Sequence, residues 1–219
     1  MNEQTKRDRI TDPEPRWPAL VALLAICGLY MALPSFVAVG PHLLLGVIAS
    51  ALILSLILSH QGGMHDLNQV LAIVVNSAVT LALIISLILL INALPERKES
   101  PILLMRSAAM LWISNVLVFA LWYWRLDAGG PNYRDRRERH VCGAFLFPQM
   151  ILEPDGVIVE GNWSPSFVDY LFLAFNTSTA LSPADTQALS RWAKLLMMLQ
   201  SLISLTVIVL LAARAVNIL

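Results

Sequence analysis

One stretch of the chain changes from apolar to polar along its length: Phe167-Val-Asp-Tyr-Leu-Phe-Leu-Ala-Phe-Asn-Thr-Ser-Thr-Ala-Leu-Ser-Pro-Ala-Asp-Thr186. The first half carries large apolar side chains, and the second half carries hydroxyls and an amide before Pro183 and Asp185. Such a segment does not suit a helix surrounded by lipid, because its polar half needs protein or water around it. In membrane proteins, half-helices with this pattern line paths for ions or solutes.

The composition of the whole chain is that of a membrane protein. Of its 219 residues, 57% are hydrophobic and 14% are charged, and the mean hydropathy is +0.68. The 15 basic residues balance the 15 acidic ones, so no nucleic-acid partner is expected. Apolar blocks of about 20 residues can each cross a ~30 Å hydrocarbon core. They predict spans at 17–38, 41–59, 69–94, 102–124 and 192–216.

The expected fold is therefore an all-α integral protein of the cell (inner or plasma) membrane, with about five transmembrane helices and a short re-entrant half-helix before the last one. We divide the chain into a polar tail (1–16), a four-helix bundle (17–125), a charged interfacial loop (126–164), and a half-helix with the final span (165–219). A second arrangement stays open, in which residues 164–182 cross fully and make a sixth span. Counting positive charges does not fix the membrane orientation.

The loop between the bundle and the half-helix contains two kinds of sequence. The charge run Arg134-Asp-Arg-Arg-Glu-Arg-His140 is expected to be solvated and attracted to anionic headgroups. The apolar stretch Phe145-Leu-Phe-Pro148 is too short to span, so it is expected to lie in the membrane interface.

Signatures of enzymes are absent from the sequence. It has no G-x-S-x-G, H-E-x-x-H, P-loop or C-x-x-C motif, so no catalytic residue and no cofactor is predicted. Cys27 and Cys142 lie in a span and a loop, which predicts no disulfide and no metal site. Polar residues inside spans are expected to face protein and to bond between helices; they are Asn76, Ser77, Thr80, Ser114 and Asn115.

From Ser166 onward, the chain resembles the pore region of potassium channels. Phe167–Thr179 matches the pore helix, Thr179–Asp185 matches the filter, and Leu195–Val216 matches the inner helix. The resemblance implies a homotetramer that passes monovalent cations, with a narrow part lined by Asn176, Thr177, Ser178, Thr179, Ser182 and Asp185 and a cavity lined by Gln200 and Ser204. The whole chain is also similar to bacterial multi-pass membrane proteins.

The filter-like segment departs from the channel pattern. Ser182 and Ala184 stand at the positions of the two filter glycines, and Pro183 stands between them. Stacked carbonyl rings need positive φ angles, which glycine adopts freely and proline cannot adopt. Potassium selectivity is therefore not expected. Two other functions remain open: a small-solute transporter that uses the half-helix for binding, and a non-conducting membrane scaffold that uses the hairpin for assembly.

Overall fold

The computed structural model describes residues 14–38, 40, 65–96, 99–135, 143–151, 163–179 and 185–218. Its elements are α2 (Trp17–Ala32), α4 (His65–Glu96), α5 (Pro101–Leu126), the 3-10 turn η1 (Asp127–Gly129), α6 (Pro131–Arg134), β1 (Phe145–Leu146), α7 (Pro148–Ile151), α8 (Phe167–Thr179), β2 (Gln187–Ala188) and α9 (Arg191–Ile218). Most of the described chain is helical, as the sequence predicts. The predicted span 41–59, Cys142 and Ser182 lie outside the described residues.

Within the described residues, three helices are long and apolar enough to cross a membrane. Their qualifying parts, Gln69–Leu94, Pro101–Arg134 and Arg191–Arg214, include most of the predicted spans 69–94, 102–124 and 192–216. The helix α2 is shorter than the span predicted at 17–38, since it ends at Ala32 after 16 residues. Its end follows from Pro34, because a proline pushes the preceding residue out of the helical region. Leu33 accordingly has φ −69° and ψ 139°.

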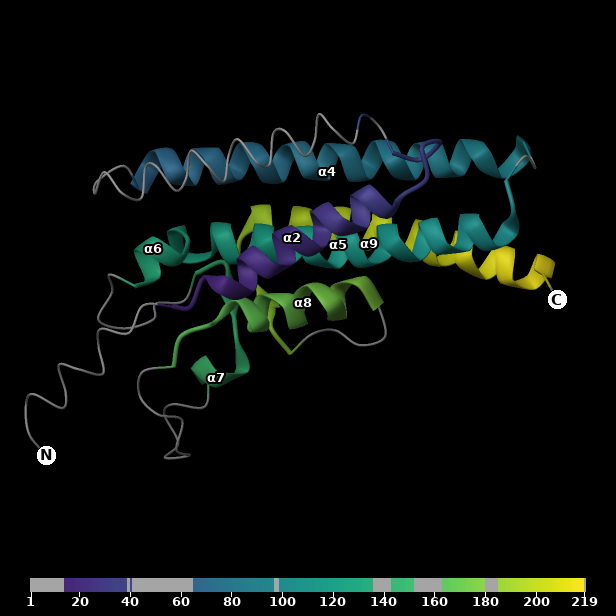
Figure 1. Cartoon of the computed structure of the whole chain (residues 1–219). Helices are drawn as coiled ribbons and strands as arrows, with labels where there is room; N and C mark the ends of the chain where they lie inside the picture. The colour runs from purple at the N-terminus through teal and green to yellow at the C-terminus, as the bar shows by residue number, and fades with distance from the viewer. Residues whose placement is uncertain are drawn as a thin grey trace, which may run out of the picture.

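The helix α5 lies at the centre of the bundle and contacts α2, α4, α8 and α9 (Figure 1). The helix α4 runs opposite to α5, because Gln69 near its start bonds to the carbonyl of Arg125 near the end of α5. The helices α4 and α9 run in the same direction, since Arg214 near the end of α9 bonds to the carbonyl of Leu94 near the end of α4. We call the end of the bundle that holds the start of α9 the first end, and the other the second end.

The helix α8 is a half-length helix that runs parallel to α9. Gln200 bonds to the carbonyl of Ala174, and Ser204 bonds to the carbonyl of Ser178, one helical turn further along both helices. Ser204 lies at the middle of α9, so α8 begins near the first end and stops halfway along the bundle (Figure 1). By Gln187 the chain is back at the first end, where β2 pairs with β1.

The short sheet at the first end joins the loop after α5 to the start of α9. The two strands are antiparallel, with Phe145 opposite Ala188 and Leu146 opposite Gln187. Phe145 is fully buried, and its ring lies 5.2 Å from that of Tyr123 and 6.0 Å from that of Trp192. Phe147 is also buried and packs against Tyr170 at 5.5 Å. These two rings therefore pack against the protein at the first end. The sequence alone did not show these contacts, because edge-to-face contacts between distant aromatic residues leave no local pattern.

Candidate functional site

Gln200 is the centre of a hydrogen-bond network between α5, α8 and α9. Its amide nitrogen donates to the carbonyl of Ala174 at 2.7 Å and to the hydroxyl of Ser178 at 2.8 Å. Its amide oxygen accepts from the hydroxyl of Tyr123 at 2.5 Å. The side chain is fully buried, so these bonds replace the hydrogen bonds to water that the amide loses on burial. A single glutamine therefore joins all three helices.

Hydroxyl groups satisfy the last carbonyls of α8. The final carbonyls of any helix lack partners within it, which is costly in the middle of an apolar bundle. Here the hydroxyl of Ser204 donates to the carbonyl of Ser178 at 2.5 Å, and that of Ser201 donates to the carbonyl of Thr177 at 3.4 Å. The hydroxyl of Thr179 donates to the carbonyl of Asn176 at 3.1 Å. The serines of α9 thus allow a helix to end inside the bundle.

The helix α5 contributes two further side chains to the network, Trp112 and Asn115. The amide nitrogen of Asn115 donates to the carbonyl of Gln200 at 3.2 Å and lies 3.5 Å from the hydroxyl of Ser178. The indole of Trp112 donates to the hydroxyl of Ser204 at 2.9 Å. Trp112 and Asn115 are three residues apart, so they lie on one face of the helix. That spacing is visible in the sequence, but only the fold shows that this face meets α8 and α9.

The structure brings together some of the residues that the sequence singled out. Ser178, Gln200 and Ser204 meet and are buried, each with at most 1% of its surface exposed. Asn176, Thr177 and Thr179 are half-buried at the inner end of α8, whereas Asp185 is exposed beside β2. Gln200 and Ser204 face α5 and α8, and the exposed face of α9 is apolar, with Leu195, Met198, Leu202, Leu205 and Val209. Among the polar residues of α4, Asn76 and Thr80 are buried and Ser77 is exposed.

A second polar cluster, which we call the Arg134 cluster, lies at the first end of the bundle. The guanidinium of Arg134 donates to Glu14 at 2.8 Å, to the carbonyl of Trp124 at 2.9 Å and to the carbonyl of Asp127 at 3.0 Å. It also lies 5.2 Å above the ring of Tyr170. The sequence placed Arg134 in a solvated charge run, but its side chain is only 1% exposed. Burial is tolerated because the charge is paired with a carboxylate and bonded to two carbonyls.

Asp127 connects the Arg134 cluster to α8 and β1. Its carboxylate accepts from the hydroxyl of Tyr170 and from the backbone nitrogen of Ala144, both at 2.6 Å. The second bond requires glycine at position 143, because a Cβ there would lie 2.3 Å from the Asp127 carboxylate. This cluster joins residues more than 100 positions apart, so the sequence alone gave no signal for it.

Comparison of the chain with protein families, with curated proteins and with solved structures finds no significant match.

Proposed function

We propose that the protein is a channel-like membrane protein that passes monovalent cations, with α8 as a re-entrant half-helix. The observation that carries the proposal is the course of the chain: α8 runs parallel to α9, stops at the middle of α9, and is followed by a return to the first end. A segment that crossed the membrane would run antiparallel to the next span. With α4, α5 and α9 as spans, α8 enters the bilayer from one side and leaves on that side.

Cations are the ions that this geometry favours. The carbonyl end of a helix carries partial negative charge, and α8 directs that end toward the middle of the bundle. Asn176, Thr177 and Thr179 add amide and hydroxyl oxygens at the same depth, and each is half-buried in the single chain. Such oxygens replace water around a cation without the cost of a buried charge. Asp185 would act at the mouth of the path, where it attracts cations.

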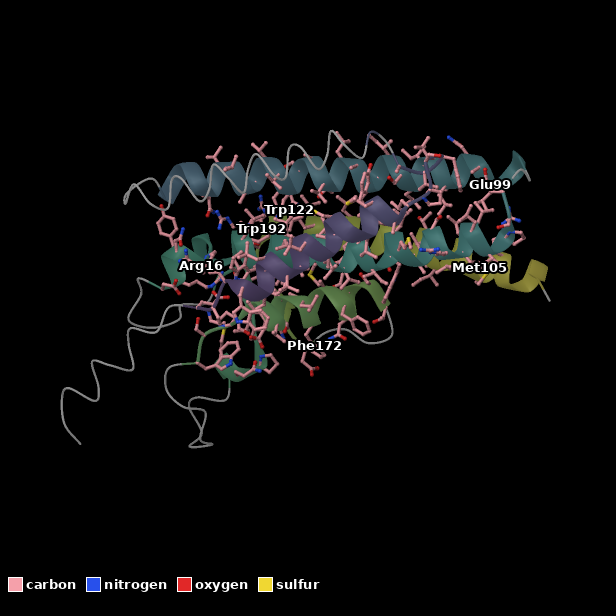
Figure 2. All side chains as sticks on the ribbon, in the orientation of Figure 1. Arg16, Glu99, Met105, Trp122, Phe172 and Trp192 are labelled. Carbon is pink, nitrogen blue, oxygen red and sulfur yellow. The ribbon has the colours of Figure 1, made fainter. Side chains whose placement is uncertain are left out.

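The path requires several copies of the chain. One half-helix lines only one side of an axis, and irregular backbone at membrane depth must be covered by protein or water. The outer face of α8 is apolar and exposed in the single chain. Phe175 is 46% exposed, and Phe172, labelled in Figure 2, is 63% exposed. We therefore propose a homo-oligomer, four copies if the arrangement follows the channel resemblance, in which Asn176, Thr177 and Thr179 surround the axis.

The test is cation flux through purified protein in liposomes. We expect a flux of monovalent cations that exceeds the anion flux, and we expect Thr179→Ala or Ser182→Ala to change it several-fold. Thr206→Ala is the matched control, since the Thr206 hydroxyl bonds only to the Leu202 carbonyl of its own helix among the described contacts. Folded oligomers that pass no ion at high protein density would contradict the proposal.

A non-conducting scaffold is the second candidate function, and the polar network favours it. Ser178, Gln200 and Ser204 find partners within one chain, so the half-helix is held without ions or water. In that case the hairpin would present residues of its inner end to a protein partner. The scaffold proposal expects a stable partner to co-purify in mild detergent and no current from the reconstituted protein.

A further inference from the structure

The hydroxyl of Ser204 in α9 bonds across to α8 and not within its own helix. A serine or threonine inside a helix often donates to the carbonyl four positions earlier. The described hydroxyls that do so are those of Thr80, Ser107, Thr177 and Thr206. For Ser204 that carbonyl belongs to Gln200, yet the hydroxyl donates to the carbonyl of Ser178 in α8 at 2.5 Å. Contacts from neighbouring helices therefore override the local preference of this serine.

Asn115 of α5 already occupies the carbonyl that Ser204 would use within α9. Its amide nitrogen donates to the carbonyl of Gln200 at 3.2 Å, and both residues are fully buried. A carbonyl can accept two bonds, but the last carbonyls of α8 have no partner in their own helix, so they are the better acceptors for the remaining hydroxyl. The Ser204 hydroxyl thus donates to α8.

Trp112 holds the oxygen of the same hydroxyl. Its indole nitrogen donates to the Ser204 oxygen at 2.9 Å, which restricts the directions in which the hydroxyl proton can point. The Trp112 ring also lies 5.9 Å from that of Phe175 near the inner end of α8. Trp112 is three positions before Asn115, so the two side chains lie on one face of α5. Together they contact α9 and the last turn of α8.

A second tryptophan in α5 shows that an indole bond alone does not redirect a hydroxyl. Trp122 donates to the Thr80 hydroxyl of α4 at 2.9 Å, the same distance as in the indole bond at Ser204. Thr80 nevertheless donates to the carbonyl of Asn76 in its own helix at 2.7 Å. Among the described contacts, that carbonyl accepts no bond from another helix. The bond from Asn115 is the feature that distinguishes the surroundings of Ser204.

The amide of Asn115 is only partly satisfied. Its Oδ1 atom is buried and has no hydrogen-bond partner among the described residues. A buried acceptor without a partner lowers stability, which offsets the gain from the bond that the amide nitrogen makes. The net contribution of Asn115 to folding is therefore small, and its main effect is on the direction of the Ser204 hydroxyl.

We propose that Asn115 and Trp112 are positioning residues. They direct the Ser204 hydroxyl to the last turn of α8 and so fix the depth at which this helix ends. That depth determines where the oxygens of Asn176 and Thr179 lie. Their role in a cation path rests on the proposed function, whereas the positioning of α8 does not.

Hydrogen exchange of residues 176–179 in the purified protein tests the positioning role through the effect of Ser204→Ala in different backgrounds. In the unmodified protein, loss of the Ser204 hydroxyl should speed this exchange about fivefold. In an Asn115→Leu background, the hydroxyl has already turned to the Gln200 carbonyl, so Ser204→Ala should change the exchange by less than about twofold. Asn76→Leu is the matched control background, because it replaces a buried asparagine of α4 whose described bond is made by its backbone carbonyl. There the fivefold effect should remain.

A second pair of variants tests the proposal independently of how well Asn115→Leu folds. Trp112→Phe keeps an aromatic ring beside Phe175 and removes the donor that orients Ser204, so it should speed exchange of residues 176–179 about threefold. Trp122→Phe loses an indole bond of the same length to Thr80 and should leave that exchange unchanged.

Fully additive effects of Asn115→Leu and Ser204→Ala would overturn the proposal, because the two side chains would then act independently. Equal exchange in the two tryptophan variants would also overturn it. Ion flux is a separate measurement. If the unmodified protein passes no ions while the exchange results are as expected, the proposed function fails and the positioning role stands.

Discussion

At the scale of single residues, Arg134 and Arg16 show how differently two neighbouring ion pairs are built. Arg134 and Glu14 are 1% and 9% exposed at the side chain, whereas Arg16 and Asp135 are 49% and 18% exposed. A buried charge that loses its partner is expensive, while an exposed pair contributes little because water and salt screen it. Both pairs attach the chain before α2 to the segment after α5, but only the first also contacts α8 through Tyr170.

Removing the charge of one partner from each ion pair gives a quantitative prediction. Glu14→Gln should lower the free energy of unfolding by about 3 kcal/mol, because it leaves the Arg134 guanidinium buried without a counter-charge. Arg16→Gln, the matched control, should change it by less than about 1 kcal/mol. Denaturant titration in detergent measures both. Equal effects of the two variants would contradict the burial of Arg134, and Glu14→Gln combined with Arg134→Met should recover much of the loss.

At the scale of helices, the long apolar blocks could be predicted from the sequence and the contacts between them could not. Apolar length alone located α4, α5 and α9 to within a few residues, because a bilayer requires about 20 apolar residues in a row. The change from apolar to polar residues predicted a half-helix before the last span, and the resemblance to a pore helix gave it the bounds Phe167–Thr179, which are those of α8. The role of Gln200 could not be predicted. The sequence pattern of a buried polar residue is the same whether its side chain faces water or bonds to a neighbouring helix. The Arg134 cluster and the rings of Phe145 and Phe147 were missed for a similar reason.

The packing of α8 against α9 depends on Gln200, and its removal is the test at this scale. Gln200→Leu keeps the side-chain size but removes three side-chain hydrogen bonds, to Ala174, Ser178 and Tyr123. At roughly 0.6–1 kcal/mol for each bond between helices, we expect a loss of about 2–3 kcal/mol in the free energy of unfolding. Thr206→Val, which loses one hydroxyl bonded within its own helix, should cost less than about 0.5 kcal/mol. Hydrogen exchange in residues 170–179 should rise in Gln200→Leu alone; unchanged exchange there would contradict the role given to this residue.

At the scale of the whole molecule, the directions of the helices determine which helix ends lie on the same side of the membrane. The helices α2 and α4 both run from the first end to the second, and α5 returns (Figure 1). The span predicted at 41–59, which would return the chain between α2 and α4, lies outside the described residues and stays a prediction. The Arg134 cluster, the short sheet and the starts of α8 and α9 then all lie on one side, and the turn between α4 and α5 lies on the other.

Labelling of single cysteines from one side of the membrane tests this arrangement most directly. In a background with Cys27 and Cys142 replaced by serine, Ser164→Cys and Gln187→Cys introduce thiols at exposed positions before and after the half-helix. Ser100→Cys introduces one in the turn between α4 and α5. We predict that an impermeant thiol reagent labels Cys at 164 and 187 from the same side and Cys at 100 from the other side. Labelling of positions 164 and 187 from opposite sides would show that the segment crosses the membrane, and the re-entrant half-helix would be wrong.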